Sequence, residues 1–255
     1  MTATKIWYFI KFFSEERYAE SFMRGRLYLN RLSYFRKLEC SIDDDGRADT
    51  HEGVSMWWQP QDICIKLSVP GIGDIEITKD DLADPVSISY QYHEDLHIIC
   101  LYSIYTNGYD TVDGKFHLDK EQSADFQSQI LIDERCLKFG SYAVITPAVP
   151  FLAQVKEALQ RRGQWFRGSL VEYYDDEMFH GEFASQDVAF KKQKQLAYQK
   201  EFRICLQTGT QGEDPIFLEV GDLNHISAKV NSSKLNDIFE LKLDKTPAIA
   251  SRDAP

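Results

Sequence analysis

The first forty residues alternate between apolar and polar stretches in a pattern that predicts a strand, a helix and a second strand. Residues 6–13 are rich in aromatic and β-branched side chains, as in a buried strand. Ser14 is a suitable cap for a following helix, which Gly25 would end. Residues 26–30 then predict a second strand, and residues 32–38 predict a short helix or turn.

Farther along the chain, alternating apolar and polar positions predict a β-rich middle. In residues 63–69 this alternation indicates a half-buried strand, and a turn with Pro and Gly at 70–73 leads to a partner strand around Ile75 and Ile77. Strands and helices follow one another without regular βαβ units, which favours the α+β class over a doubly wound sheet. The remaining predicted strands are 86–92, 96–105, 141–146, 199–207 and 215–220, and the remaining predicted helices are 124–138, 151–159 and 233–241.

The composition fits a globular protein with an acidic surface. Of the 255 residues, 43% are hydrophobic and 27% are charged, which is ordinary globular usage. We expect one domain over residues 1–243 and a flexible tail at 244–255. The formal net charge of −11 disfavours binding of nucleic acid through bulk electrostatics, but it leaves room for a local basic cleft and suits a basic partner.

The cysteines and the apolar segments bear on location and on metals. The five cysteines are scattered and form no CxxC pair, so we expect free thiols in a reducing compartment and no zinc site. No stretch approaches the ~20 apolar residues that a membrane span requires. The sequence therefore predicts a cytoplasmic protein without a membrane contact and without a metal site.

Arginines and aromatic residues are interleaved between Arg24 and Arg36. Guanidinium groups can clamp phosphates, while the rings of Tyr28 and Tyr34 can stack on bases or on nicotinamide. The alternative is an amphipathic corner of the fold in which the arginines pair with nearby aspartates, such as those at 43–45. The pattern fits both interpretations.

A glutamate and an arginine stand in the middle of the strand predicted at 199–207. In strand geometry Phe202 and Ile204 point to one face, whereas Glu201 and Arg203 point to the other. A glutamate within a strand is costly unless it is paired, exposed in a cleft or used chemically. Glu201 is therefore a candidate functional residue, and the alternative is a Glu–Arg ladder on a solvated face.

These two regions belong to a longer series of motifs. The series is GRLYLNRLSYFRKLE at 25–39, RADTHEG at 47–53, FKKQKQLAYQKEFRI at 190–204 and EVGDLNHIS at 219–227. In this order it resembles a widespread prokaryotic family within the ADP-ribosyltransferase superfamily, and in particular the toxins of phage-defence toxin–antitoxin systems. The resemblance covers residues 6–228. It implies an α+β fold with a split β-sheet and flanking helices, and NAD as the co-substrate in a cleft between two small sheets.

The resemblance implies a role for each matching residue. Glu201 on the late strand would stabilise positive charge on the ribose and take a proton from the acceptor. The early strand, where the family has His or Arg, has neither in residues 7–11, so Arg26 or Arg31 would supply that contact. The other implied roles are catalytic for Tyr28 and Arg31, NAD binding for Tyr8, Asn30, Tyr34 and Arg36, and acceptor binding for Arg47, Asp49, Glu52, Lys191 and Arg203.

The implied function is that of a toxin that transfers ADP-ribose from NAD to RNA, at adenine in mRNA, with a protein acceptor left open. An antitoxin protein and a SecB-like chaperone are the implied partners. Two other classes fit parts of the pattern. One is a non-catalytic interaction module that uses the arginine–aromatic corner as its surface. The other is a metal-dependent nuclease in which Mg²⁺ is gathered by Asp49, Glu52, Asp175 and Asp176.

Overall fold

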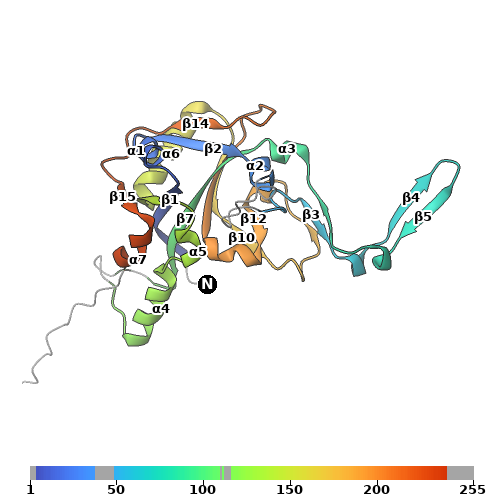
Figure 1. Ribbon diagram of the computed structural model, residues 1–255, viewed down its shortest axis with the longest axis horizontal. Helices are drawn as coiled ribbons and strands as arrows, with labels where there is room; N and C mark the ends of the chain where they lie inside the picture. Colours follow the sequence, from blue (N-terminus) through green and yellow to red (C-terminus); the bar gives the residue numbers. More distant parts are fainter. Residues whose placement is uncertain (1–3, 38–48, 110, 112–115, 240–255) are drawn as a thin grey trace, which may run out of the picture.

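The protein has a mixed α/β architecture around a large antiparallel sheet, shown in Figure 1 as a computed structural model that describes residues 4–37, 49–109, 111 and 116–239. This arrangement confirms the predicted α+β class. The strands of the large sheet are β1 (Thr4–Phe13), β2 (Arg26–Arg31), β7 (His97–Asn107), β8 (Tyr142–Pro147), β9 (Phe166–Leu170), β13 (Glu201–Leu206), β14 (Ile216–Glu219) and β15 (Ala228–Asn231). Their order is β14-β2-β7-β1-β8-β15, and β13 joins β7 and carries β9.

Helices cover both faces of the large sheet. One face carries α1 (Glu16–Met23) and α6 (Ala148–Arg162), and the other carries α4 (Lys120–Ile130), α5 (Glu134–Leu137) and α7 (Leu235–Ile238). Successive side chains of β1 point alternately to the two faces of the sheet. Phe9 therefore packs in the first apolar core and Ile10 in the second. Among the described residues, none of the helices combines the length and the apolar character that crossing a membrane requires.

The opening strand–helix–strand unit forms as predicted, apart from the cap of its helix. The helix α1 begins at Glu16 after the N-cap residue Glu15, and no side-chain hydrogen bond caps it. The predicted capping role of Ser14 is therefore wrong, because Ser14 lies one position before the N-cap. Gly25 follows the helix with a φ of 84°, as expected for a helix end. The short helix predicted after β2 is α2 (Leu32–Lys37).

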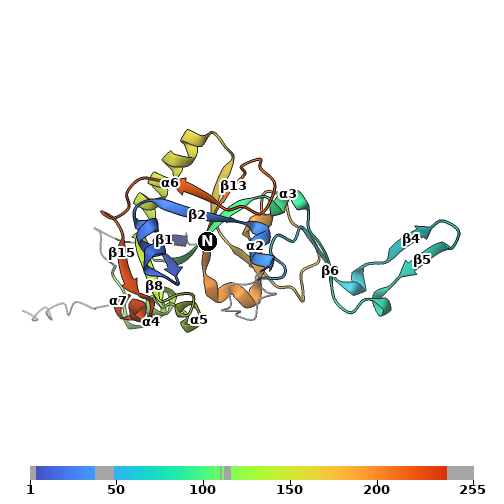
Figure 2. The ribbon, with the colours of Figure 1, turned by 45° about the horizontal axis from the view of Figure 1, so that its top comes forward.

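The predicted β-hairpin forms, but it is not half-buried. It consists of β4 (Ile65–Val69) and β5 (Gly73–Ile77), which project from the body of the molecule in Figures 1 and 2. None of the residues in these two strands is buried. The alternation of apolar and polar positions correctly predicted two faces, but it carries no information on whether another layer covers the apolar one.

Several other predicted segments differ from the structure at their ends. The segment 86–92 is β6 (Val86–Ile88) followed by the short helix α3 (Gln91–Glu94), and the single helix predicted at 124–138 is divided into α4 and α5. The tail predicted at 244–255 lies outside the described residues. The remaining elements are β3 (Met56–Trp58), β10 (Glu172–Tyr174), β11 (Gly181–Glu182), β12 (Lys191–Gln193) and the 3₁₀ helices η2 (Pro60–Asp62), η3 (Lys79–Asp81), η4 (Val188–Phe190), η5 (Lys194–Gln199) and η6 (Ser232–Lys234).

Gly25, which follows α1, lies in close contact with the backbone just after β14. A Cβ on Gly25 would lie 1.9 Å from the backbone oxygen of Gly221, and a φ of 84° is itself unfavourable for other residues. We expect Gly25→Ala to lower the free energy of unfolding by about 3 kcal/mol or more. Gly163 ends α6 at a φ of 65° with open space around its missing Cβ, so Gly163→Ala should cost only about 1 kcal/mol. Urea unfolding measures both variants, and equal losses would contradict this interpretation.

Candidate functional site

β1 and β2 pair with the same edge of β7 at different places and leave a gap between them, which we call the split of the sheet. β1 pairs with residues 102–107 of β7, and β2 pairs with residues 97–98. β13 occupies the opposite edge along residues 97–102. In the part of the chain that the structure describes, residues 99–101 therefore have no strand partner on the first edge.

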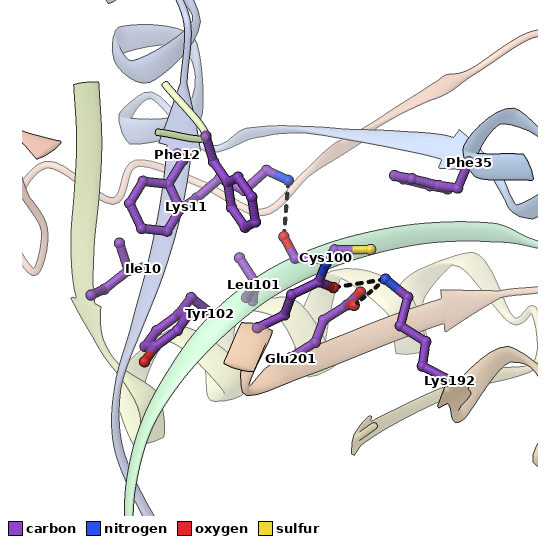
Figure 3. Close-up of a pocket in the computed structure, with 11 residues that line it drawn as sticks. Ile10, Lys11, Phe12, Phe35, Cys100, Leu101, Tyr102, Lys192 and Glu201 are labelled. Carbon is purple, nitrogen blue, oxygen red and sulfur yellow. Dashed lines mark hydrogen bonds and ion pairs between the residues drawn. The ribbon is translucent and has the colours of Figure 1, made fainter. Parts of the chain in front are cut away.

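A cavity of about 110 Å³ lies beside this gap (Figure 3). The Nζ atom of Lys11 donates a hydrogen bond of 2.9 Å to the backbone oxygen of Cys100, so the Lys11 ammonium group lies at the gap between β1 and β2. The rings of Phe12, Phe35 and Tyr102 line other parts of the wall. The polar side chains on the cavity are those of Lys11, Cys100, Lys192, Gln199 and Glu201. The cavity thus combines an aromatic wall with one carboxylate and two lysines.

Glu201 reaches this cavity as the first residue of β13. Phe202 and Ile204 lie in the core beneath α1 and α6, as the strand alternation predicted, and Glu201 and Arg203 lie on the opposite face. The alternative of a solvated Glu–Arg ladder is wrong, because Glu201 is 5% exposed and Arg203 is fully buried. Such burial is stable only if both charges have close partners.

The Arg203 guanidinium joins two carboxylates inside the protein. Its Nη1 and Nη2 atoms each donate to a different oxygen of Glu52 at 2.6 Å, and its Nε donates to Oε1 of Glu201 at 2.7 Å. A further bond of 2.6 Å goes to the backbone oxygen of Ala189. On the other side of Glu201, Oε2 lies 3.0 Å from Nζ of Lys192, and Figure 3 shows these two groups pointing toward each other. We call Glu52, Lys192, Glu201 and Arg203 the buried charge cluster.

The cluster keeps Glu201 ionised. Burial alone would raise the pKa of the Glu201 carboxyl, but the charges of Arg203 and Lys192 outweigh it and hold this pKa well below its usual range. Burial alone would likewise lower the pKa of Lys192, yet the surrounding carboxylates hold it above its ordinary value. Glu201 therefore presents a fixed negative charge to the cavity at neutral pH.

The backbone around Glu201 is fixed on both sides. The preceding residue, Lys200, has a φ of 40° and is the only described residue other than glycine with a positive φ. Its carbonyl accepts hydrogen bonds from the backbone N–H and the hydroxyl of Ser103, at 2.9 and 2.5 Å. The N–H of Glu201 donates to the Tyr173 hydroxyl at 2.9 Å. A left-handed lysine costs roughly 1–3 kcal/mol, and such strain is concentrated at functional sites.

Asp49 lies next to the buried charge cluster but lacks a full set of partners. It is 3% exposed, and its Oδ1 accepts a bond of 3.0 Å from the N–H of His51. Its Oδ2 is buried without a hydrogen-bond partner among the described residues. Burial raises the pKa of Asp49, although Lys192 and Arg203 act in the opposite direction.

The structure does not bring Tyr28 and Arg31 to the cavity with Glu201. Tyr28 is half exposed, and its ring packs against that of Phe217 with 5.4 Å between the centroids. Arg31 is buried, and its Nη1 donates to the backbone oxygens of Asp95 and Thr210, both at 2.6 Å. Arg31 thereby connects the end of β2 with two loops.

The residues predicted to bind NAD are dispersed along β1, β2 and α2. Tyr8 and Tyr34 are exposed, and only Tyr34 adjoins the cavity wall, through an edge-on contact of 5.5 Å with Phe35. Asn30 pairs with Ile98 of β7. Arg36 donates 2.6 Å bonds to the backbone oxygen of Glu52 and to the carboxylate of Glu94. Its guanidinium thus supports the segment that carries Glu52.

The residues predicted to bind the acceptor fall into three groups. Asp49, Glu52 and Arg203 are buried together, as described above. Lys191 pairs with Glu172 at 2.5 Å near the surface, and Arg47 lies outside the described residues. The cavity residues Lys192 and Gln199 were not predicted, since a lysine in a Lys-rich segment is expected to be solvated. Only the three-dimensional structure shows that Glu52 and Glu201 surround Lys192.

The arrangement gives no support to a magnesium site. Both oxygens of Glu52 are occupied by Arg203. Asp175 pairs with Lys194 at 2.9 Å, and the Asp176 carboxylate accepts from Gln193 at 3.3 Å. Within the described residues, no group of three or more His, Cys, Asp or Glu side chains is arranged to hold a metal ion.

Comparison with known proteins adds no relatives from which a role could be transferred. No protein-family model, no curated protein and no solved structure matches the chain. The interpretation of the site therefore depends on its own geometry and on the sequence motifs.

The first prediction concerns the buried charge cluster. We expect Arg203→Met to lower the free energy of unfolding by about 3–5 kcal/mol, because Glu52 would stay buried without its bidentate partner. Arg26 is the matched control, since it also stands on a strand and pairs with a glutamate, Glu219, but at the surface and at 3.1 Å. Arg26→Met should cost less than about 1 kcal/mol. Urea unfolding measures both variants. A similarly small loss of unfolding free energy in both would show that the buried charge cluster contributes little to stability.

The second prediction concerns pH. Because the folded-state pKa of Asp49 is raised, its contribution to stability is complete below the unfolded value of 3.8 and is lost as pH rises through the folded pKa. The free energy of unfolding of the wild type, relative to that of Asp49→Asn, should therefore fall as the pH rises above about 4. The pKa of the exposed Asp81 is lowered by hydrogen bonds from Thr78, so Asp81→Asn should show no such fall. A constant difference for Asp49→Asn would show that its carboxyl titrates normally.

Proposed function

We propose that the protein is a NAD-dependent ADP-ribosyltransferase, in which the split sheet forms the ADP-ribosyltransferase-like fold and Glu201 acts on the ribose. The observation that carries this proposal is the position of Glu201. Its ionised carboxylate lines a cavity at the split between β1 and β2, on a backbone that is fixed on both sides.

The cavity is suited to the part of NAD that reacts. Its volume of about 110 Å³ is of the order that accommodates one small ring, and Phe35 offers an aromatic surface for nicotinamide. Glu201 can accept a hydrogen bond from a ribose hydroxyl. The positive charge of Lys11 favours the diphosphate nearby. The residues present therefore fit the co-substrate, although Arg31 and Arg36 are occupied by other partners.

The electrostatics of the site favour one of the two roles considered for Glu201. Bound NAD supplies a glycosidic bond that breaks with its electron pair leaving on nicotinamide, so that positive charge develops on the ribose. A fixed negative charge in a water-poor site stabilises that charge. The lowered pKa makes Glu201 a weak proton acceptor, because an efficient general base has a pKa near the working pH. We therefore assign Glu201 the role of electrostatic stabiliser.

We further propose RNA as the acceptor, with adenine in mRNA as the modified base. Tyr34 supports this choice, because its exposed ring adjoins Phe35 at the cavity and aromatic rings stack on single-stranded bases. A toxin of this kind would act in the cytoplasm and would be controlled by an antitoxin protein and a SecB-like chaperone. These partners belong to the same proposal and are motivated by the sequence motifs.

The test uses labelled NAD with RNA, DNA and protein offered as separate acceptors. We expect Glu201→Gln to reduce label transfer by at least about a hundredfold, since the stabilising charge is removed. Arg203 keeps its bidentate bond to Glu52 in this variant, but Lys192 loses its nearest carboxylate. Circular dichroism and urea unfolding therefore accompany the assay, and activity is compared only for folded protein. Glu219→Gln is the matched control, because it makes the same change in an exposed ion pair, and it should retain full activity.

The outcomes separate the possible functions. Label on RNA alone supports a transferase with RNA as its acceptor. Label on DNA or on protein supports a transferase that uses that acceptor instead. Full activity of Glu201→Gln would remove this residue from the mechanism. Absence of both label transfer and nicotinamide release with every acceptor would contradict an enzyme that uses NAD.

A further inference from the structure

The β4–β5 hairpin stands apart from the rest of the molecule. Figures 1 and 2 show it extending from the body beyond the sheet that contains β3 and β6. Its two strands pair with each other and with no further strand of the described residues. Two-stranded hairpins of this kind are at best marginally stable in water, and they gain stability when another surface covers their apolar face.

The two faces of the hairpin differ sharply. Residues that pair directly across the strands lie on one face, and the pairs Ile65↔Ile77 and Leu67↔Ile75 make that face apolar. On the other face Lys66 pairs with Glu76 at 2.8 Å, and Ser68 donates to Asp74 at 2.6 Å. Leu67 and Ile75 remain 45% and 43% exposed. The polar face is thus internally satisfied, whereas the apolar face is uncovered.

The turn places a further aliphatic side chain at the tip of the hairpin. The N–H of Ile72 donates to the backbone oxygen of Val69 at 3.1 Å, and Gly71 has a φ of 82°. With Pro70 before that glycine, these features define a type II turn. Ile72 is 76% exposed at the end of this rigid turn. Together with Leu67 and Ile75, it gives the hairpin three exposed aliphatic side chains.

The hairpin and its base are strongly acidic. Residues 62–84 contain six acidic residues and two lysines, a formal charge of −4 in a chain of −11. Among the described residues, no salt bridge joins Asp74, Asp80, Asp81 or Asp84 to a basic side chain, and all four are exposed. A second copy of the chain would bring the same charge and be repelled, so the complementary surface is basic.

We propose that the β4–β5 hairpin is a docking site for a partner protein whose contact surface has an apolar centre with a rim of Lys and Arg. The aliphatic side chains of Leu67 and Ile75, with Ile72 at the tip, meet the apolar centre, and the aspartates of the hairpin and its base meet the basic rim. The carboxylates speed and orient the encounter, while burial of the aliphatic side chains supplies most of the affinity. This surface is independent of the proposed transferase activity.

A synthetic peptide probe tests the proposal on the full chain. A fluorescent peptide of alternating isoleucine and lysine should bind at least tenfold more tightly than the matching isoleucine–glutamate peptide, measured by anisotropy at physiological salt. The double substitution of Leu67→Ser with Ile75→Ser should weaken binding at least tenfold and leave the melting temperature of the body unchanged. The matched control, Leu131→Ser with Val149→Ser, alters two exposed apolar residues elsewhere and should bind like the wild type.

Four results would overturn the proposal, and two of them would identify a different occupant of the hairpin. Equal binding of the two peptides would remove the role of the acidic rim. Undiminished binding by the hairpin double variant would place the contact elsewhere. Dimers in sedimentation that disappear in the hairpin variant would identify a second copy as the occupant. Binding to vesicles of neutral and anionic lipid that depends on the hairpin would identify a membrane surface instead.

Discussion

The bidentate bond between Arg203 and Glu52 is the interaction on which the site depends. It joins strand β13 to a segment about 150 residues earlier in the chain, and both side chains are fully buried. A buried guanidinium is tolerated only when nearly all of its donors are occupied, and here Glu52, Glu201 and the Ala189 carbonyl occupy them. The segments that carry these groups must therefore assemble together, because any one of them missing would leave an uncompensated charge inside the protein.

This constraint also underlies the role that we propose for Glu201. Two cations hold its carboxylate ionised, and the left-handed backbone at Lys200 fixes the direction in which it points. Such an arrangement is costly to build, and the cost is incurred before any ligand binds. A charge that is already oriented needs no rearrangement when positive charge develops beside it, which is the main advantage that an enzyme has over water.

The sequence predicted local features well and long-range ones poorly. The alternation of Phe202 and Ile204 with Glu201 and Arg203 followed from strand geometry, and Gly25 marked a helix end correctly. The family resemblance implied a catalytic role for Arg31, but its carbonyl partners come from loops that only the fold brings close. For the same reason the burial of Lys192 between distant glutamates left no trace in the sequence. The hairpin of β4 and β5 pairs as predicted, whereas the covering of its apolar face depends on other layers.

The split of the large sheet has a mechanical consequence. Among the described strands, β7 is paired with both β1 and β2, so these two strands can change their relative twist only if β7 and the paired β13 bend near residues 99–101 of β7. The hydrogen bond from Lys11 to Cys100 lies at this point and opposes such bending. A ligand that bound Lys11 would compete with the Cys100 carbonyl for its Nζ atom and would make the sheet easier to bend at this point. Ligand binding in the cavity and the curvature of the sheet would therefore change together.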